Sequence, residues 1–80
     1  MKNFVVYSKD DCPYCDRIQK VLELTRQNFV RYKLGVDFEK EEFYNEFGQG
    51  STFPQVIYDG EILGGCTETI QWLREQKVIQ

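Results

Sequence analysis

The first 34 residues carry a strand pattern, a helix pattern and a second strand pattern in direct succession, and this order most restricts the possible folds. Residues 3–7 are mostly β-branched and aromatic, which is typical of a buried strand. From Pro13 to about Asn28, apolar residues recur every three or four positions, as in an amphipathic helix. Residues 29–34 alternate apolar and charged side chains, as in a half-buried strand. Two strands joined by a crossover helix form a parallel pair.

A second helix and a hairpin are predicted next. Phenylalanines spaced among Glu-rich positions indicate a helix that reaches about Phe47, and residues 48–51 (Gly-Gln-Gly-Ser) end it. Residues 55–58 and 61–63 are predicted strands on either side of the Asp-Gly dipeptide at 59–60, which is the strongest hairpin turn signal in the chain. These two strands should therefore pair antiparallel.

A third helix is predicted near the end of the sequence. Thr67 is placed to cap it, and an apolar stripe runs through Ile70 and Leu73 to Lys77 or Val78. The full order is βαβαββα. It predicts an α/β fold in three layers, with a four-stranded mixed sheet covered by helices on both faces. This order matches the thioredoxin fold.

Length and composition limit the class of protein. Eighty residues, 41% of them hydrophobic, can bury only one core, so we expect one domain over residues 1–80. A net charge of −3 without a basic cluster argues against a nucleic-acid partner. No apolar run approaches the roughly 18 residues of a membrane span. We therefore expect a soluble, monomeric, cytoplasmic protein without membrane association, and its odd number of cysteines, three, fits poorly with a secreted disulfide scaffold.

The segment Cys12-Pro13-Tyr14-Cys15 lies at the predicted junction of the first strand and the first helix. Backbone N–H groups and the helix dipole at this junction favour a Cys12 thiolate, which is the nucleophile of disulfide exchange. Cys15 follows on about the same side of the first helical turn, where it can form a disulfide with Cys12. Pro13 suits the first position of a helix, and Lys9 adds positive charge nearby.

Acidic neighbours and two alternative uses of the cysteines weigh against a reactive Cys12 thiolate. The acidic neighbours are Asp10, Asp11 and Asp16. Their negative charges disfavour a thiolate, although we expect solvent to screen them largely. A C-x-x-C pair can be half of a zinc site, but such a site needs about four ligands, and the chain has no His and one further Cys. A structural disulfide, or a pair of inert core thiols, is the other alternative.

Three motifs together resemble the dithiol glutaredoxins: Cys-Pro-Tyr-Cys at 12–15, Thr-Phe-Pro at 52–54 and Gly-Gly-Cys-Thr-Glu at 64–68. They occur in the family's order, and with the element order the resemblance covers nearly the whole chain. It implies a thiol–disulfide oxidoreductase in which Cys12 attacks protein disulfides and glutathione mixed disulfides and Cys15 resolves the intermediate. Glutathione is then a co-substrate, with no bound cofactor and no metal. Ribonucleotide reductase is one target that the resemblance suggests.

The resemblance also implies where glutathione binds. The Phe53–Pro54 peptide should be cis and face the cysteines, so that the Phe53 backbone pairs with glutathione, while Lys9 meets the glycine carboxylate and residues 65–68 receive the γ-glutamyl end. The expected binding residues are Lys9, Tyr14, Thr52, Phe53, Pro54, Gly65, Cys66, Thr67 and Glu68. Without the resemblance, Pro54 could simply begin an edge strand, and residues 64–68 could be a tight turn with a threonine cap.

The chain departs from the family pattern in two places. Ser51 stands where many glutaredoxins have a basic residue, and Phe53 replaces a common valine, so glutathione binding is expected to be weaker or to depend more on Lys9. Cys66 is expected to be a small, semi-buried residue without assigned chemistry. The alternatives are a redoxin reduced directly by thioredoxin reductase, a non-catalytic thioredoxin-fold module, and an iron–sulfur cluster held between two copies by Cys12 and glutathione. Intact Cys15 and Pro13 weigh against the last two.

Overall fold

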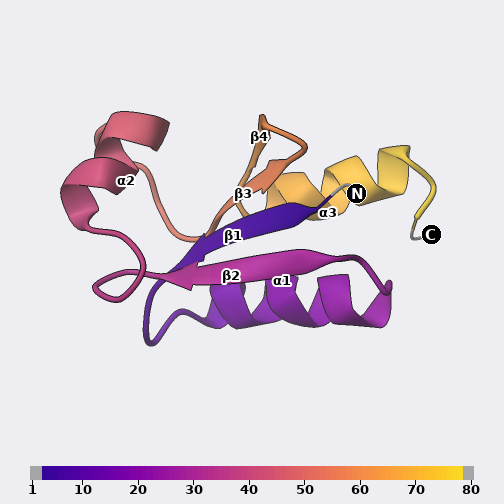
Figure 1. Ribbon diagram of the computed structural model, residues 1–80. Coiled ribbons are helices and arrows are strands. Elements are labelled where there is room, and N and C mark those ends of the chain that lie inside the picture. The colour runs from indigo at the N-terminus through magenta and orange to yellow at the C-terminus, as the bar shows by residue number, and fades with distance from the viewer. Residues whose placement is uncertain (1–2, 79–80) are drawn as a thin grey trace.

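The computed structural model describes residues 3–78, in which a four-stranded sheet is flanked by three helices (Figure 1). The elements are β1 (Phe4–Ser8), α1 (Pro13–Leu24), β2 (Phe29–Lys33), α2 (Lys40–Phe47), β3 (Gln55–Tyr58), β4 (Glu61–Gly64) and α3 (Cys66–Glu75). The predicted order βαβαββα is confirmed. The first two and the last two residues of the predicted domain lie outside the described residues.

The sheet has the strand order β2-β1-β3-β4 and is mixed. β1 pairs parallel with β2, as the crossover predicts, and β3 pairs antiparallel with both β1 and β4. The predicted hairpin joins β3 to β4. Its two turn residues, Asp59 (φ 51°) and Gly60 (φ 84°), both adopt the left-handed conformation that a two-residue type I′ turn requires.

One face of the sheet is covered by α1 and α3 together. Every second residue of β1 points to this face, so Phe4 and Val6 pack against Ile18 of α1 and Leu73 of α3, and all four are at most 1% exposed. The buried residues of this core are Phe4, Val6, Ile18, Leu22, Val56, Cys66 and Leu73. Burial of each large apolar side chain contributes about 1.5–3 kcal/mol, so this layer holds α1, and with it the cysteine motif, against the sheet.

The opposite face carries an aromatic cluster, which we define as Tyr7, Phe38, Phe43, Phe47 and Phe53. The Tyr7 ring lies 5.0 Å from the rings of Phe38 and Phe47, and Phe43 is 1% exposed. These contacts attach α2 to the end of the sheet toward which β1 runs (Figure 1). The helices therefore lie on both faces, and the three-layer prediction is confirmed.

Helix α1 is shorter than predicted, because it ends at Leu24 and not near Asn28. Arg26 adopts a left-handed conformation (φ 58°), which a continuing α-helix cannot contain. The backbone N–H of Gln27 then bonds to the carbonyl oxygen of Leu22 (2.9 Å), which closes the helix in a Schellman motif. Apolar periodicity continues past this point in the sequence and does not reveal the motif.

Helix α3 ends in the same way. Its last residue is Glu75, and Lys77 adopts the left-handed conformation (φ 62°). The backbone N–H of Val78 bonds to the carbonyl oxygen of Leu73 (2.9 Å). The prediction that the apolar stripe of this helix reaches Lys77 or Val78 is therefore wrong. None of the helices within residues 3–78 is both long enough and apolar enough to cross a membrane.

Candidate active site

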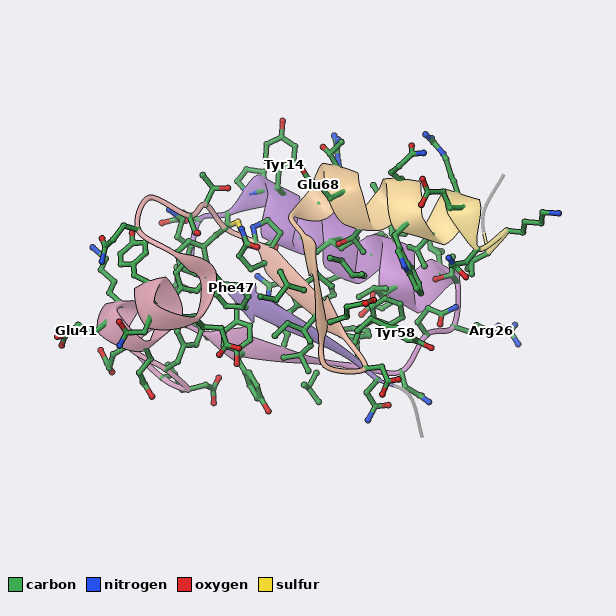
Figure 2. The ribbon with its side chains drawn as sticks, turned by 90° about the horizontal axis from the view of Figure 1, so that it is seen from above. Tyr14, Arg26, Glu41, Phe47, Tyr58 and Glu68 are labelled. Carbon is green, nitrogen blue, oxygen red and sulfur yellow. A yellow bond between two sulfur atoms is a disulfide. The ribbon has the colours of Figure 1, made fainter. Side chains whose placement is uncertain are left out.

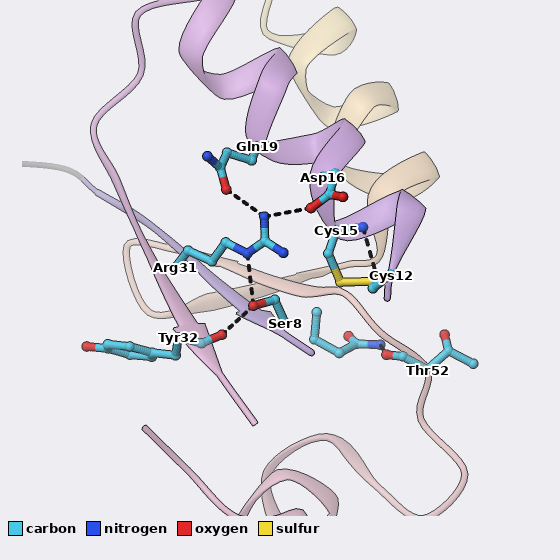
Figure 3. The surroundings of a disulfide bond; sticks show 9 residues. Ser8, Cys12, Cys15, Asp16, Gln19, Arg31, Tyr32 and Thr52 are labelled. Carbon is cyan, nitrogen blue, oxygen red and sulfur yellow. Dashed lines mark hydrogen bonds and ion pairs between the residues drawn. A yellow bond between two sulfur atoms is a disulfide. The ribbon is translucent and has the colours of Figure 1, made fainter. Parts of the chain in front are cut away.

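The two cysteines of the C-x-x-C motif lie at the start of α1, just after the loop that connects β1 to α1. Cys12 is the N-cap of α1, with an extended backbone (φ −124°, ψ 94°), and Pro13 is the first helical residue. The backbone N–H of Cys15 donates a hydrogen bond to Cys12 Sγ (3.2 Å), and the two cysteines form a disulfide with Cα atoms 5.2 Å apart (Figure 3). After reduction, the same N–H group is placed to stabilise a Cys12 thiolate.

Solvent access distinguishes the two sulfur-bearing residues. Cys12 is 6% exposed, whereas Cys15 is fully buried beneath it. An incoming disulfide therefore reaches Cys12 first, and Cys15 can attack only a partner already bound to Cys12. This order agrees with the roles predicted from the sequence, with Cys12 as the attacking residue and Cys15 as the resolving residue.

A pocket of about 150 Å³ is formed by the residues beside the cysteine pair. Its lining contains eight of the nine residues expected to bind glutathione, namely Tyr14, Thr52, Phe53, Pro54, Gly65, Cys66, Thr67 and Glu68. Figure 2 shows Tyr14 and Glu68 at neighbouring ends of α1 and α3. The fold thus brings together three segments that are far apart in the sequence. Lys9, the ninth residue, does not line the pocket.

The start of α3 forms one wall of this pocket and differs from the prediction. The N-cap is Gly65, not Thr67, which lies inside the helix. Gly65 has no side chain that could cap the helix. Instead, its backbone N–H donates to Glu68 Oε1 (3.0 Å), so the Glu68 carboxylate satisfies one of the unpaired groups at the helix start.

The Phe53–Pro54 peptide is cis, as the family resemblance implies. The Phe53 ring stacks on Phe43 with ring centroids 4.1 Å apart and an angle of 9° between the planes. Lys9 Nζ lies over the Phe53 ring, 5.4 Å from its centroid. Lys9 is therefore held next to the pocket by an aromatic residue of the pocket wall.

Two of the three acidic residues that flank the motif, Asp10 and Asp16, have basic partners that sequence reasoning missed. Lys33 Nζ lies 3.0 Å from Asp10 Oδ1, and Arg31 Nη1 lies 3.0 Å from Asp16 Oδ1. Both basic residues belong to β2, fifteen or more positions from their partners. The one signal available in the sequence was the predicted parallel pairing of the first two strands, which places the end of β2 beside the active-site loop.

Cys66 lines the pocket but differs chemically from the cysteine pair. It is a free thiol and is 6% exposed, so it is buried and not semi-buried as expected. Burial raises the pKa of the Cys66 thiol, nearby Glu68 raises it further, and Arg17 lowers it. Within residues 3–78, no group of three or more His, Cys, Asp or Glu side chains is placed to hold a metal ion.

Comparisons with known proteins agree with this geometry. The glutaredoxin family model matches residues 4–63. Glutaredoxin 3 of Escherichia coli is 32% identical over 69 residues, which cover 85% of this chain and 82% of that protein. Glutaredoxin-C6 of rice is 31% identical over 78 residues, which cover 94% of this chain and 70% of that protein.

Solved structures show the same relationship. Glutaredoxin 1 of Francisella tularensis, crystallised with cacodylate, has a TM-score of 0.78 and 25% identity, and 98% of each chain is covered. A buckwheat glutaredoxin, solved as a complex with glutathione, has a TM-score of 0.77 and 28% identity, with 96% of this chain and 73% of that chain covered. On its sequence, its thioredoxin-like fold and its paired cysteines, the chain belongs to the glutaredoxin family of disulfide oxidoreductases.

Proposed function

We propose that this glutaredoxin uses glutathione as its electron donor and reduces both protein disulfides and glutathione mixed disulfides. The observation that carries the proposal is the pocket beside Cys12, whose walls are the Thr52-Phe53-Pro54 segment and the start of α3. The similar buckwheat glutaredoxin has been solved with glutathione. A pocket next to the attacking sulfur is the place where a thiol co-substrate has to bind.

The proposed reaction begins with the reduced protein. The Cys12 thiolate attacks one sulfur of a substrate disulfide, the substrate S–S bond breaks, and the departing thiolate takes a proton from solvent. Cys15 then loses its proton and attacks Cys12 Sγ, which releases the second substrate thiolate and forms the Cys12–Cys15 disulfide. Two glutathione molecules reduce this disulfide, and each gives up one proton and one electron as they form glutathione disulfide.

The start of α3 in the pocket wall and Lys9 beside the pocket suit a tripeptide with two carboxylates. The N–H groups and the Thr67 hydroxyl at the start of α3 are proposed to bind the γ-glutamyl carboxylate, because a helix N-terminus favours an anion. Lys9, held over Phe53, is proposed to meet the glycine carboxylate. The Phe53 backbone supplies the groups that pair with the peptide part of the ligand.

Turnover with two electron sources tests the proposal. Oxidised protein should be reduced efficiently by glutathione with glutathione reductase, and far less by an uncharged monothiol of similar pKa. Lys9→Ala with Thr67→Ala should raise the glutathione concentration needed, while Cys12 stays reactive toward a small alkylating agent. Efficient reduction by thioredoxin reductase, with none by glutathione, would overturn the proposal and support the alternative redoxin.

The proposal extends to the cell as three expectations. Glutathione-coupled reduction needs a reducing compartment, so we place the protein in the cytoplasm. We also expect it to act as a monomer. Ribonucleotide reductase is a candidate target on the family resemblance alone. Glutathione-dependent support of ribonucleotide reduction by the purified protein tests the target, and sedimentation tests the monomer. Cell fractionation tests the location.

A further inference from the structure

Arg31 of β2 joins the first turn of α1 to the sheet. Its Nη1 lies 3.0 Å from Asp16 Oδ1 and 2.6 Å from Gln19 Oε1, and its Nε donates to Ser8 Oγ (3.0 Å). Figure 3 shows the guanidinium beside the Cys12–Cys15 disulfide, between the end of β1 and the helix. Asp16 directly follows Cys15, so one of these contacts is to the residue adjoining the redox pair.

Arg31 contacts a buried serine whose hydroxyl both donates and accepts a hydrogen bond. Ser8 is 1% exposed, and its hydroxyl donates to the backbone oxygen of Tyr32 (2.6 Å) while it accepts from Arg31. A buried hydroxyl with both functions satisfied fixes its neighbour in one orientation. If the Arg31 side chain moved away from the cysteine motif, the buried Ser8 hydroxyl would lose the donor that it accepts from and keep only its bond to Tyr32.

The two charges of the Arg31–Asp16 pair differ in their contact with water. The Arg31 side chain is 26% exposed, whereas that of Asp16 is 73% exposed. Solvent screens the field of an exposed carboxylate more than that of a half-buried guanidinium. The guanidinium is therefore the less screened of the two charges.

We propose that Arg31 is a positioning residue for disulfide exchange, which fixes the first turn of α1 and holds a cation beside it so that Cys12 reacts as a thiolate. The step it supports is the attack of the Cys12 thiolate on a substrate disulfide, in which one S–S bond forms, another breaks and the leaving thiolate is protonated by solvent. The inference rests on the redox chemistry of the cysteine pair and does not depend on the electron donor.

Other charged or titratable groups lie on the elements that surround the redox pair. These groups are Lys9, Asp10 and Asp11 of the loop, Asp16 and Arg17 of α1, Lys33 of β2, and Cys66 and Glu68 of α3. Lys33 is engaged with Asp10 on the loop, and Arg17 lies over the Tyr14 ring, 5.5 Å from its centroid. Arg31 differs from them because it is bonded to both β1 and α1.

Alkylation of Cys12 as a function of pH tests the role of Arg31. The reduced protein is treated with iodoacetamide, and the Cys12 peptide is quantified by mass spectrometry. Arg31→Gln removes the charge but retains an amide donor, and it should raise the Cys12 pKa by about 0.5–1 unit. At a pH below the pKa, this change lowers the alkylation rate roughly three- to tenfold, because less of Cys12 is thiolate. Arg31→Lys, which keeps the charge, should restore most of the rate.

Two further variants complete the test. Asp16→Asn should leave the pKa of Cys12 at or below its original value, because it removes the opposing charge. Arg74→Gln makes the same change of net charge at an exposed position near the far end of α3 and should have no effect. An unchanged titration in Arg31→Gln, or an equal shift in Arg31→Lys, would overturn the proposal. A thermal melt of each variant checks that it is folded under the conditions in which the alkylation rates are compared.

Discussion

Replacing Phe43 with alanine should strongly destabilise the protein. Phe43 is 1% exposed and lies at the centre of the aromatic cluster. Its ring centroid is 4.1 Å from that of Phe53, 5.0 Å from Phe47 and 5.9 Å from Phe38. These ring contacts attach α2 to the sheet and also support the pocket wall, so their loss affects both stability and the active site.

The expected loss is a large part of the total stability. Truncation of a buried Phe to Ala costs about 3–5 kcal/mol, because apolar burial is lost and a cavity remains. At roughly 0.05–0.15 kcal/mol per residue, an 80-residue chain has a free energy of unfolding of about 4–12 kcal/mol. For a domain of this size each kcal/mol lowers the Tm by about 4–8 °C, so Phe43→Ala should lower it by roughly 12–40 °C.

Urea unfolding followed by circular dichroism measures this loss. Leu24→Ala is the control, because Leu24 is 74% exposed and should change the free energy of unfolding by no more than about 0.5 kcal/mol. If Phe43→Ala does not fold, Phe43→Leu should still cost about 1–2 kcal/mol. A Phe43→Ala protein within about 1 kcal/mol of the original would refute the reasoning that this cluster holds α2.

Three further predictions concern the active site. Cys12→Ser should abolish disulfide reduction, whereas Cys15→Ser should lose reduction of protein disulfides but keep activity on glutathione mixed disulfides. If the two variants behave identically on both substrates, the assigned roles are wrong. Gly64→Ala should lower the free energy of unfolding by about 1–3 kcal/mol in urea titrations, because φ is 114° and the added Cβ would lie 2.9 Å from Glu68 Cβ. Burial raises the pKa of Cys66, so the folded protein keeps a proton that the unfolded chain loses. The free energy of unfolding of the reduced protein should therefore fall as pH rises above the ordinary thiol value of about 8.5, and Cys66→Ser should reduce that fall.

Local patterns in the sequence were enough to predict the element order and the redox pair. Strand and helix periodicity depends on residues a few positions apart, and the Asp-Gly dipeptide at 59–60 needs only its own backbone preference. Cys12 and Cys15 are likewise separated by less than one helical turn. The same local reasoning failed at helix ends, as at Thr67 and Asn28, because capping depends on the conformation of individual residues that periodicity does not contain.

Only the tertiary structure decided which distant side chains meet around the cysteines. The parallel register of β1 with β2, Ser8 opposite Lys33, places Arg31 and Lys33 beside the acidic residues that flank the motif. The stacking of Phe53 on Phe43 likewise depends on where α2 packs. Such contacts join segments that are far apart in the sequence, so local residue patterns do not predict them. They form only when the strand register and the packing of helices on both faces are in place.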